Sequence, residues 1–98
     1  MRRLSEREFV VAGELDGSTT EQFDASLTEA RDVEGVVVVD LSGLTFLDSL
    51  GIQCLIRLGM SRSPNGLILR HPTARVARVL ALRGLDRASL WTIERTER

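Results

Sequence analysis

Residues 36–60 constrain the fold of this chain more than any other stretch. Four consecutive valines, residues 36–39, precede Asp40 and form a β-branched run typical of a strand buried on both faces. A loop anchored by Leu44 and Phe46 is expected to follow. Apolar residues then recur with the spacing of one helical face, at Ile52, Leu55, Ile56 and Gly59. The stretch therefore predicts a strand, a loop and a helix.

The predicted helix begins beside Ser49. Asp48 and Ser49 stand directly before the apolar segment, where a serine hydroxyl caps unpaired backbone N–H groups. From spacing alone, an N-cap is the favoured interpretation of Ser49. Asp48 is then a helix-dipole partner or a turn residue, and Asp16, in a loop flanked by Gly13 and Gly17, is a turn residue.

Strands and helices are expected to alternate along the chain. Strands are predicted at residues 7–12, 36–40, 67–70 and 88–93, with a turn or bulge at 13–17. One helix should follow a capping box at Ser18 or Thr19, and another should run from an N-cap at Thr73 to Gly84. This β-α-β-α-β-α-β order predicts an α/β fold with a mostly parallel sheet and residues 36–40 at its centre.

Composition favours one soluble domain over residues 1–98. The chain is 43% hydrophobic and 28% charged, without an apolar run long enough for a membrane span or signal core, so a cytoplasmic protein is expected. A formal net charge of −1 argues against direct nucleic-acid binding. Cys54 and His71 are the only cysteine and histidine, too few for a metal cluster, and Cys54 is expected in the core.

Several short motifs together resemble the signature of the STAS family of anti-sigma-factor antagonists. That signature is Asp-Leu-Ser, an apolar anchor, and Asp-Ser-Ser-Gly followed by Leu or Ile. The chain carries the first motif at residues 40–42, the anchor at Phe46 and the last motif at residues 48–52, with Leu50 in place of the second serine. Gly-Glu-Leu-Asp at residues 13–16 and Gly-Leu-Asp at 84–86 also fit the family pattern.

The resemblance implies a STAS fold, a mixed but mostly parallel sheet of roughly four to five strands packed with helices. It also implies an additional N-terminal strand, which would be short or missing here. Ser49 corresponds to the serine that a partner kinase phosphorylates. The unphosphorylated protein would bind an anti-sigma factor serine kinase and release a sigma factor, until phosphorylation ends binding and a phosphatase resets the switch. The expected partner-binding residues are Asp16, Asp48, Ser49, Leu50, Gly51 and Ile52, although core packing is the favoured role of Ile52.

Two other functions stay open. STAS domains also serve as non-phosphorylated adaptor subunits of lipid-transport ABC complexes, and such an adaptor would tolerate Ser49→Ala. A hydrolase with Ser49 as nucleophile would need a base, and His71 is expected in a loop. No Gly-x-Ser-x-Gly or nucleotide-binding loop occurs, so no enzymatic activity, cofactor or metal is expected. A monomer without membrane insertion is the expected state.

Overall fold

The computed structural model describes residues 1–63, 66–87 and 89–95. Its elements follow in chain order: β1 (Arg2–Arg3), β2 (Glu8–Val10), β3 (Gly13–Leu15), α1 (Thr20–Arg31), β4 (Val37–Asp40), β5 (Leu44–Leu47), α2 (Ser49–Arg62), β6 (Leu67–Arg70), α3 (Ala74–Leu82), the 3₁₀ helix η1 (Leu85–Arg87) and β7 (Thr92–Glu94).

The main sheet has five strands in the order β1-β2-β4-β6-β7. Strands β2, β4, β6 and β7 pair in parallel, whereas β1 pairs antiparallel with β2. The mixed, mostly parallel sheet with β4 at its centre is therefore confirmed. The additional N-terminal strand is present as the two residues of β1.

Strands β3 and β5 form a separate two-stranded parallel sheet, which the sequence did not predict. Residues 44–47 were expected in a loop, but they pair with β3 and leave Phe46 41% exposed. A register shift between Gly13 and Glu14 agrees with the predicted bulge, and Gly13 has a φ of 80°. Because β3 and β5 are about 30 residues apart in the sequence, no local pattern indicates that they pair.

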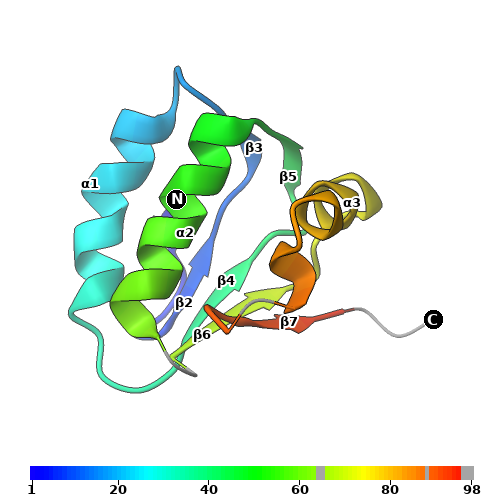
Figure 1. The fold of residues 1–98 in the computed structure, drawn as a ribbon. Coiled ribbons are helices and arrows are strands. Elements are labelled where there is room, and N and C mark those ends of the chain that lie inside the picture. The colour runs from blue at the N-terminus through cyan, green and yellow to red at the C-terminus, as the bar shows by residue number, and fades with distance from the viewer. Residues whose placement is uncertain (64–65, 88, 96–98) are drawn as a thin grey trace.

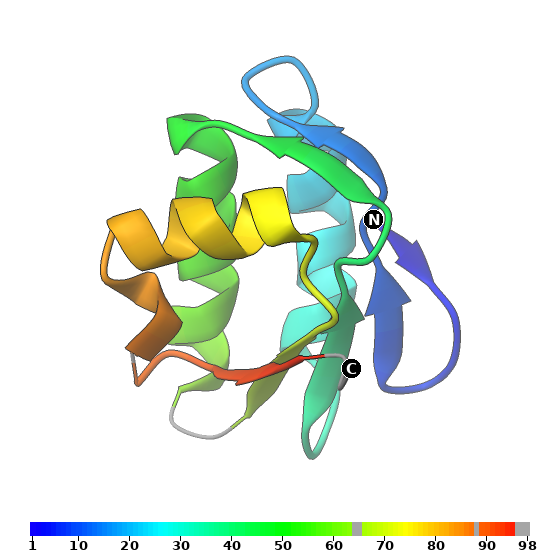
Figure 2. The same cartoon turned by 90° about the vertical axis from the view of Figure 1, so that its right-hand side faces the viewer.

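Helices α1 and α2 lie side by side against one face of the main sheet (Figure 1). Helix α3 lies beside β5, on the opposite side of α2 from α1 (Figures 1 and 2). The core between these layers holds fully buried side chains from both helices and strands. Among them are Phe9, Phe23, Val37, Val39, Leu55, Leu58, Leu67 and Leu69.

The prediction that the central strand is buried on both faces is wrong. Val37 and Val39 face the helices and are fully buried, whereas Val38 and Asp40 on the other face are only half-buried. In register with them lie Ile68 and Arg70 of β6. Helices α1 and α2, which follow β3 and β5, both pack on the same face of the sheet. Val38 and Asp40 on the opposite face therefore remain partly exposed to solvent.

Arg70 anchors a group of charges on that open face. Its guanidinium donates to Glu94 Oε1 at 2.6 Å and to Glu8 Oε2 at 3.4 Å. These two carboxylates, the first most strongly, raise the pKa of Arg70. The half-exposed ion pairs join β2, β6 and β7 across the strand ends.

The predicted helix termini hold at α3 and fail at α1. Thr73 Oγ1 accepts the Val76 N–H at 3.2 Å, and Gly84 follows the helix with a φ of 71°, as predicted. At α1 Thr19 occupies the N-cap without a side-chain cap bond, so the capping box is wrong. Its hydroxyl instead accepts the Asp16 N–H and donates to the Glu14 carbonyl oxygen, both at 2.9 Å.

The last strand is shorter than predicted. Residues 85–87 form η1, and β7 begins only at Thr92; Ala88, where the predicted strand starts, lies outside the described residues. Trp91 is 6% exposed and donates its indole N–H to the Leu85 carbonyl oxygen at 3.0 Å. This packing against η1 leaves three residues to pair with β6.

None of the helices in the described ranges has the length and apolar character needed to cross a bilayer.

Candidate functional site

The N-terminus of α2 is capped by Asp48 and not by Ser49. Asp48 has extended backbone dihedrals, and its Oδ1 accepts the Gly51 N–H at 2.9 Å. The Asp48 carbonyl oxygen accepts the Ile52 N–H at 2.9 Å as the first turn closes. Ser49 is therefore the first helical residue and not the N-cap that the sequence predicted; the N-cap lies one place earlier, at Asp48. Both residue types cap helices well, which is why the sequence could not separate them.

Ser49 presents its side chain to solvent. Within the described residues its hydroxyl makes no hydrogen bond to the protein, since capping falls to Asp48. The N–H groups of Ser49 and Leu50 precede the first intrahelical bond and lie at the positive end of the α2 dipole. A solvent-exposed hydroxyl thus sits beside unpaired backbone donors.

The β3–α1 loop meets this helix terminus, because β3 and β5 pair in parallel and end at the same edge. The Gly17 N–H lies 3.4 Å from Asp48 Oδ2, and the Asp48 N–H donates to the Leu15 carbonyl oxygen at 3.3 Å. A Cβ atom on Gly17 would lie 2.9 Å from Leu50 Cδ1, which shows how closely the loop approaches α2. The β3–α1 loop and the N-terminus of α2 therefore form one continuous surface.

Asp16 organises that loop through its side chain. Its Oδ1 accepts the Ser18 hydroxyl at 2.7 Å and the Ser18 N–H at 2.9 Å. These bonds stabilise the carboxylate and hold the pKa of Asp16 below its ordinary value of 3.8. The turn role predicted for Asp16 is observed, and its carboxylate stays charged near neutral pH.

Two of the predicted partner-binding residues lie beneath the surface. Gly51 is buried, and a Cβ atom there would lie 2.2 Å from the Leu15 carbonyl oxygen. Ile52 is 3% exposed and belongs to the hydrophobic core. Both residues hold α2 against β3 and β5, so they position the surface without reaching solvent.

Two apolar side chains close to Ser49 in the sequence are exposed. Leu50 is 49% exposed, and Phe46, two residues before the Asp48 cap, is 41% exposed. The sequence had assigned Phe46 to anchoring a loop, and only its outward place on β5 reveals it as a surface residue. We call Asp16, Gly17, Phe46, Asp48, Ser49 and Leu50 the α2 surface.

The Asp-Leu-Ser motif has a structural role at the end of β4. Leu41 is fully buried, and Asp40 Oδ1 accepts the Ser42 N–H at 2.7 Å. Burial raises the pKa of Asp40, but the bonds from Ser42 and the charges of His71 and Arg70 outweigh it, so the pKa lies below 3.8. The motif shapes the turn that leads into β5.

The family comparison agrees with this architecture. A family model described as Mlab, STAS domain matches residues 3–93. The chain belongs to the STAS domain family. A comparison with curated proteins found no match. The predicted STAS fold is thus confirmed by both the family match and the sheet topology.

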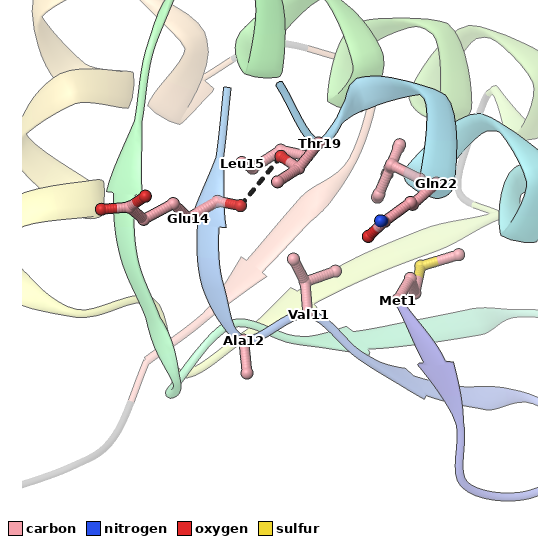
Figure 3. A pocket seen from close by; sticks show the side chains of 8 residues that line it. Met1, Val11, Ala12, Glu14, Leu15, Thr19 and Gln22 are labelled. Carbon is pink, nitrogen blue, oxygen red and sulfur yellow. Dashed lines mark hydrogen bonds between the residues drawn. The ribbon is translucent and has the colours of Figure 1, made fainter. Parts of the chain in front are cut away.

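A shallow cavity of about 220 Å³ lies behind the β3–α1 loop of this STAS domain. Figure 3 shows Thr19 donating its hydrogen bond to the Glu14 carbonyl oxygen at 2.9 Å beside the cavity, with Met1, Val11 and Gln22 around it. The lining residues are Met1, Val11, Ala12, Glu14, Leu15, Thr19, Gln22 and Phe23. None of them belongs to the α2 surface.

Metal ligands are not gathered in the described ranges, where no group of three His, Cys, Asp or Glu side chains could hold an ion. Cys54 is fully buried in the STAS core, as predicted, and both burial and the charge of Asp24 raise the pKa of its thiol. Arg57 binds that same Asp24 at 3.0 Å. Cys54 is therefore a packing residue between α1 and α2.

Proposed function

We propose that this STAS domain is an anti-sigma factor antagonist that switches partners through Ser49. In its unphosphorylated form it binds a cytoplasmic anti-sigma factor serine kinase through the α2 surface, which releases a sigma factor. The kinase transfers phosphate from its own ATP to Ser49, and a phosphatase restores the starting state. The supporting observation is an exposed Ser49 hydroxyl that takes no part in capping α2.

Phosphorylation at this position is compatible with the fold. The phosphate would sit next to the unpaired N–H groups of Ser49 and Leu50, at the helix end where the dipole favours negative charge. Asp48 continues to cap the helix through Gly51, so modification of Ser49 removes no existing bond. The switch therefore changes the surface and leaves the core as it is.

The added charge acts on the contact with the partner. A phosphoserine carries about −1.5 to −2 charges at neutral pH. It would enter a surface that already holds Asp16 and Asp48 and that offers the partner two exposed apolar side chains, Leu50 and Phe46. Burying an unpaired dianion in such a contact costs several kcal/mol, enough to weaken binding by orders of magnitude.

A non-phosphorylated adaptor in a lipid-transport ABC complex is the second candidate. Two observations favour it: the matched family model is described as Mlab, and Leu50 replaces the second serine of the antagonist signature. In this role the α2 surface binds one partner permanently, and Ser49 contributes only its small polar side chain. The chain has no enzymatic role in either proposal.

Intact-mass spectrometry of the protein purified from its own host, with site mapping, distinguishes the two functions. The antagonist predicts a fraction heavier by one phosphate, which maps to Ser49 and disappears in Ser49→Ala. Ser63→Ala is the matched control, because Ser63 is also exposed but lies at the opposite end of α2. An unmodified protein under every growth condition, copurifying with a transport ATPase even as Ser49→Ala, would overturn the switch and establish the adaptor.

A further inference from the structure

The two halves of the chain carry opposite charge. Residues 1–48 contain eleven acidic and four basic side chains, a net charge of −7, and residues 49–98 contain three acidic and nine basic side chains, a net charge of +6. The near-neutral total therefore combines an acidic first half with a basic second half. The ion pairs Arg57–Asp24 and Arg70–Glu8 join the two halves, whereas α3 lies on the opposite side of α2 from α1 (Figure 1).

The positive charge concentrates on the outward side of α3 and the turn that follows it. Arg75, Arg78 and Leu82 follow the i, i+3, i+7 spacing of one helical stripe and are all exposed, whereas Val76 and Leu80 face the core. Arg83 and Arg87 extend the positive charge beyond the helix. We call Arg75, Arg78, Leu82, Arg83 and Arg87 the arginine face.

These arginines differ from Arg57, Arg62 and Arg70, which the fold itself uses. Arg57 and Arg70 form ion pairs, and Arg62 binds backbone carbonyl groups. Across the described part of the chain, by contrast, the four arginines of the arginine face have no salt bridge, and α3 itself contains no acidic residue. Like charges three residues apart on a helix destabilise it, so the fold itself gains nothing from Arg75 beside Arg78.

The arginine face also exposes apolar area. Leu82 is 80% exposed, more than any other large hydrophobic side chain among the described residues. Guanidinium groups around an exposed leucine suit a segment that carries carboxylates next to an apolar side chain, because arginine binds carboxylates through two parallel hydrogen bonds. We propose that the arginine face is a second docking surface and that its occupant is an acidic segment of a partner protein.

Other polyanions fit the charge distribution less well. A nucleic acid or an anionic membrane extends far beyond four arginines and would meet the strongly acidic first half of the chain. One exposed leucine offers little area for insertion into lipid, because the apolar stripe of α3 is already in the core. A protein segment is small enough to contact α3 alone.

Strand β5 connects the helix that carries the arginine face with the α2 surface. Helix α3 packs against β5, and the Thr73 hydroxyl lies 3.4 Å from the Leu44 carbonyl oxygen at the start of that strand. The same strand carries Phe46. One partner can therefore contact both surfaces, with its acidic part over α3, and this charge pattern would fix the orientation in which it docks.

Fluorescence anisotropy with a labelled peptide of glutamates and interspersed leucines tests the proposal. The control peptide has glutamine in place of each glutamate. We expect the full chain to bind the acidic peptide and not the glutamine peptide. Its affinity for the acidic peptide should fall as the NaCl concentration rises from about 0.05 M to about 0.3 M. Amide NMR shifts on binding should map to residues 74–87.

A pair of matched double variants locates the binding. Arg75→Gln with Arg78→Gln should weaken binding about fivefold. Arg2→Gln with Arg31→Gln changes the net charge equally, at exposed arginines outside the arginine face, and should leave the affinity within about twofold. Ser49→Ala should bind the peptide like the natural chain. The peptide-binding result therefore does not depend on the phosphorylation switch.

Three results would overturn the proposal. The first is equal binding of both peptides, and the second is equal weakening by both double variants. The third is absence of peptide binding together with binding to phosphatidylglycerol vesicles that the Arg75 and Arg78 substitutions abolish. The last result would assign the arginine face to anionic lipid instead.

Discussion

The Asp48 carboxylate reaches Gly17, 31 residues earlier in the chain, and so joins the β3–α1 loop to the N-terminus of α2. Its Oδ2 lies 3.4 Å from the Gly17 N–H, while Oδ1 caps α2 through Gly51 at 2.9 Å. One side chain thus fixes both the helix terminus and the loop that lies against it. Its removal should loosen both at once.

We expect Asp48→Ala to lower the free energy of unfolding by about 1 kcal/mol, the usual cost of losing an N-cap side chain. Asp48→Asn should lose less, because the amide oxygen still accepts a hydrogen bond. Ser49→Ala is the matched control and should stay within about 0.5 kcal/mol, since Ser49 does not cap the helix. Urea denaturation measures all three. The reverse order, with Ser49→Ala the more damaging, would place the N-cap at Ser49.

Gly51 is required where α2 crosses β3. A Cβ atom would lie 2.2 Å from the Leu15 carbonyl oxygen and 2.9 Å from Leu47 Cδ1, and a backbone oxygen cannot move aside as a flexible side chain can. Gly51→Ala should therefore destabilise the fold by about 3 kcal/mol, the upper part of the range for overpacking. Thermal unfolding measures this loss.

Gln53→Ala is the comparison for that substitution, because Gln53 is exposed on the same helix and should tolerate alanine within about 0.5 kcal/mol. Equal melting temperatures for Gly51→Ala and the natural chain would contradict the close approach of α2 to β3.

Arg62 ties together three segments at the other end of α2. Its guanidinium donates to the Ala30 and Arg31 carbonyl oxygens at the end of α1, each at 3.1 Å, to Gly66 before β6 at 3.1 Å, and to Gly35 before β4. Arg62→Ala removes every one of these bonds. We expect a loss of about 2–3 kcal/mol in a denaturation curve, the range for hydrogen bonds that involve a charged group.

Arg62→Lys should recover only part of that stability, because an ammonium group lacks the planar fork that reaches several carbonyls. Arg78→Ala serves as the control, since Arg78 is exposed and without an ion pair in the described ranges; it should change stability by less than about 0.5 kcal/mol. Similar losses for Arg62→Ala and Arg78→Ala would contradict the bridging role.

The sequence predicted the parts of this fold that local patterns encode. The valine run places β4 at the centre of the sheet, and Thr73 and Gly84 bound α3. The prediction failed where distant segments decide the outcome. Pairing of β3 with β5 turns an expected loop into a strand and brings Phe46 to the surface, and no feature near residue 46 indicates it.

The candidate site shows the same division. Its place at the start of α2 follows from sequence, because Asp48 and Ser49 precede an apolar helical pattern. Asp48 caps α2 in place of Ser49 because its own backbone dihedrals are extended, and Gly51 is buried because Leu15 approaches it closely. Tertiary contacts therefore decide which residues of the motif face solvent.

Asp16 provides a pH-dependent test of the β3–α1 loop. The hydroxyl and N–H of Ser18 both donate to its Oδ1 and hold its pKa below the ordinary 3.8. Because the pKa is lowered in the folded state, the stabilisation is present above pH 3.8 and is lost as the pH falls through the folded value. Carboxyl-carbon NMR titration should find the Asp16 pKa below 3.8 in the natural chain. Ser18→Ala should move it back toward 3.8, since the hydroxyl bond is the largest cause of the shift. An unchanged Asp16 pKa in that variant would show that Ser18 does not hold the carboxylate in this turn.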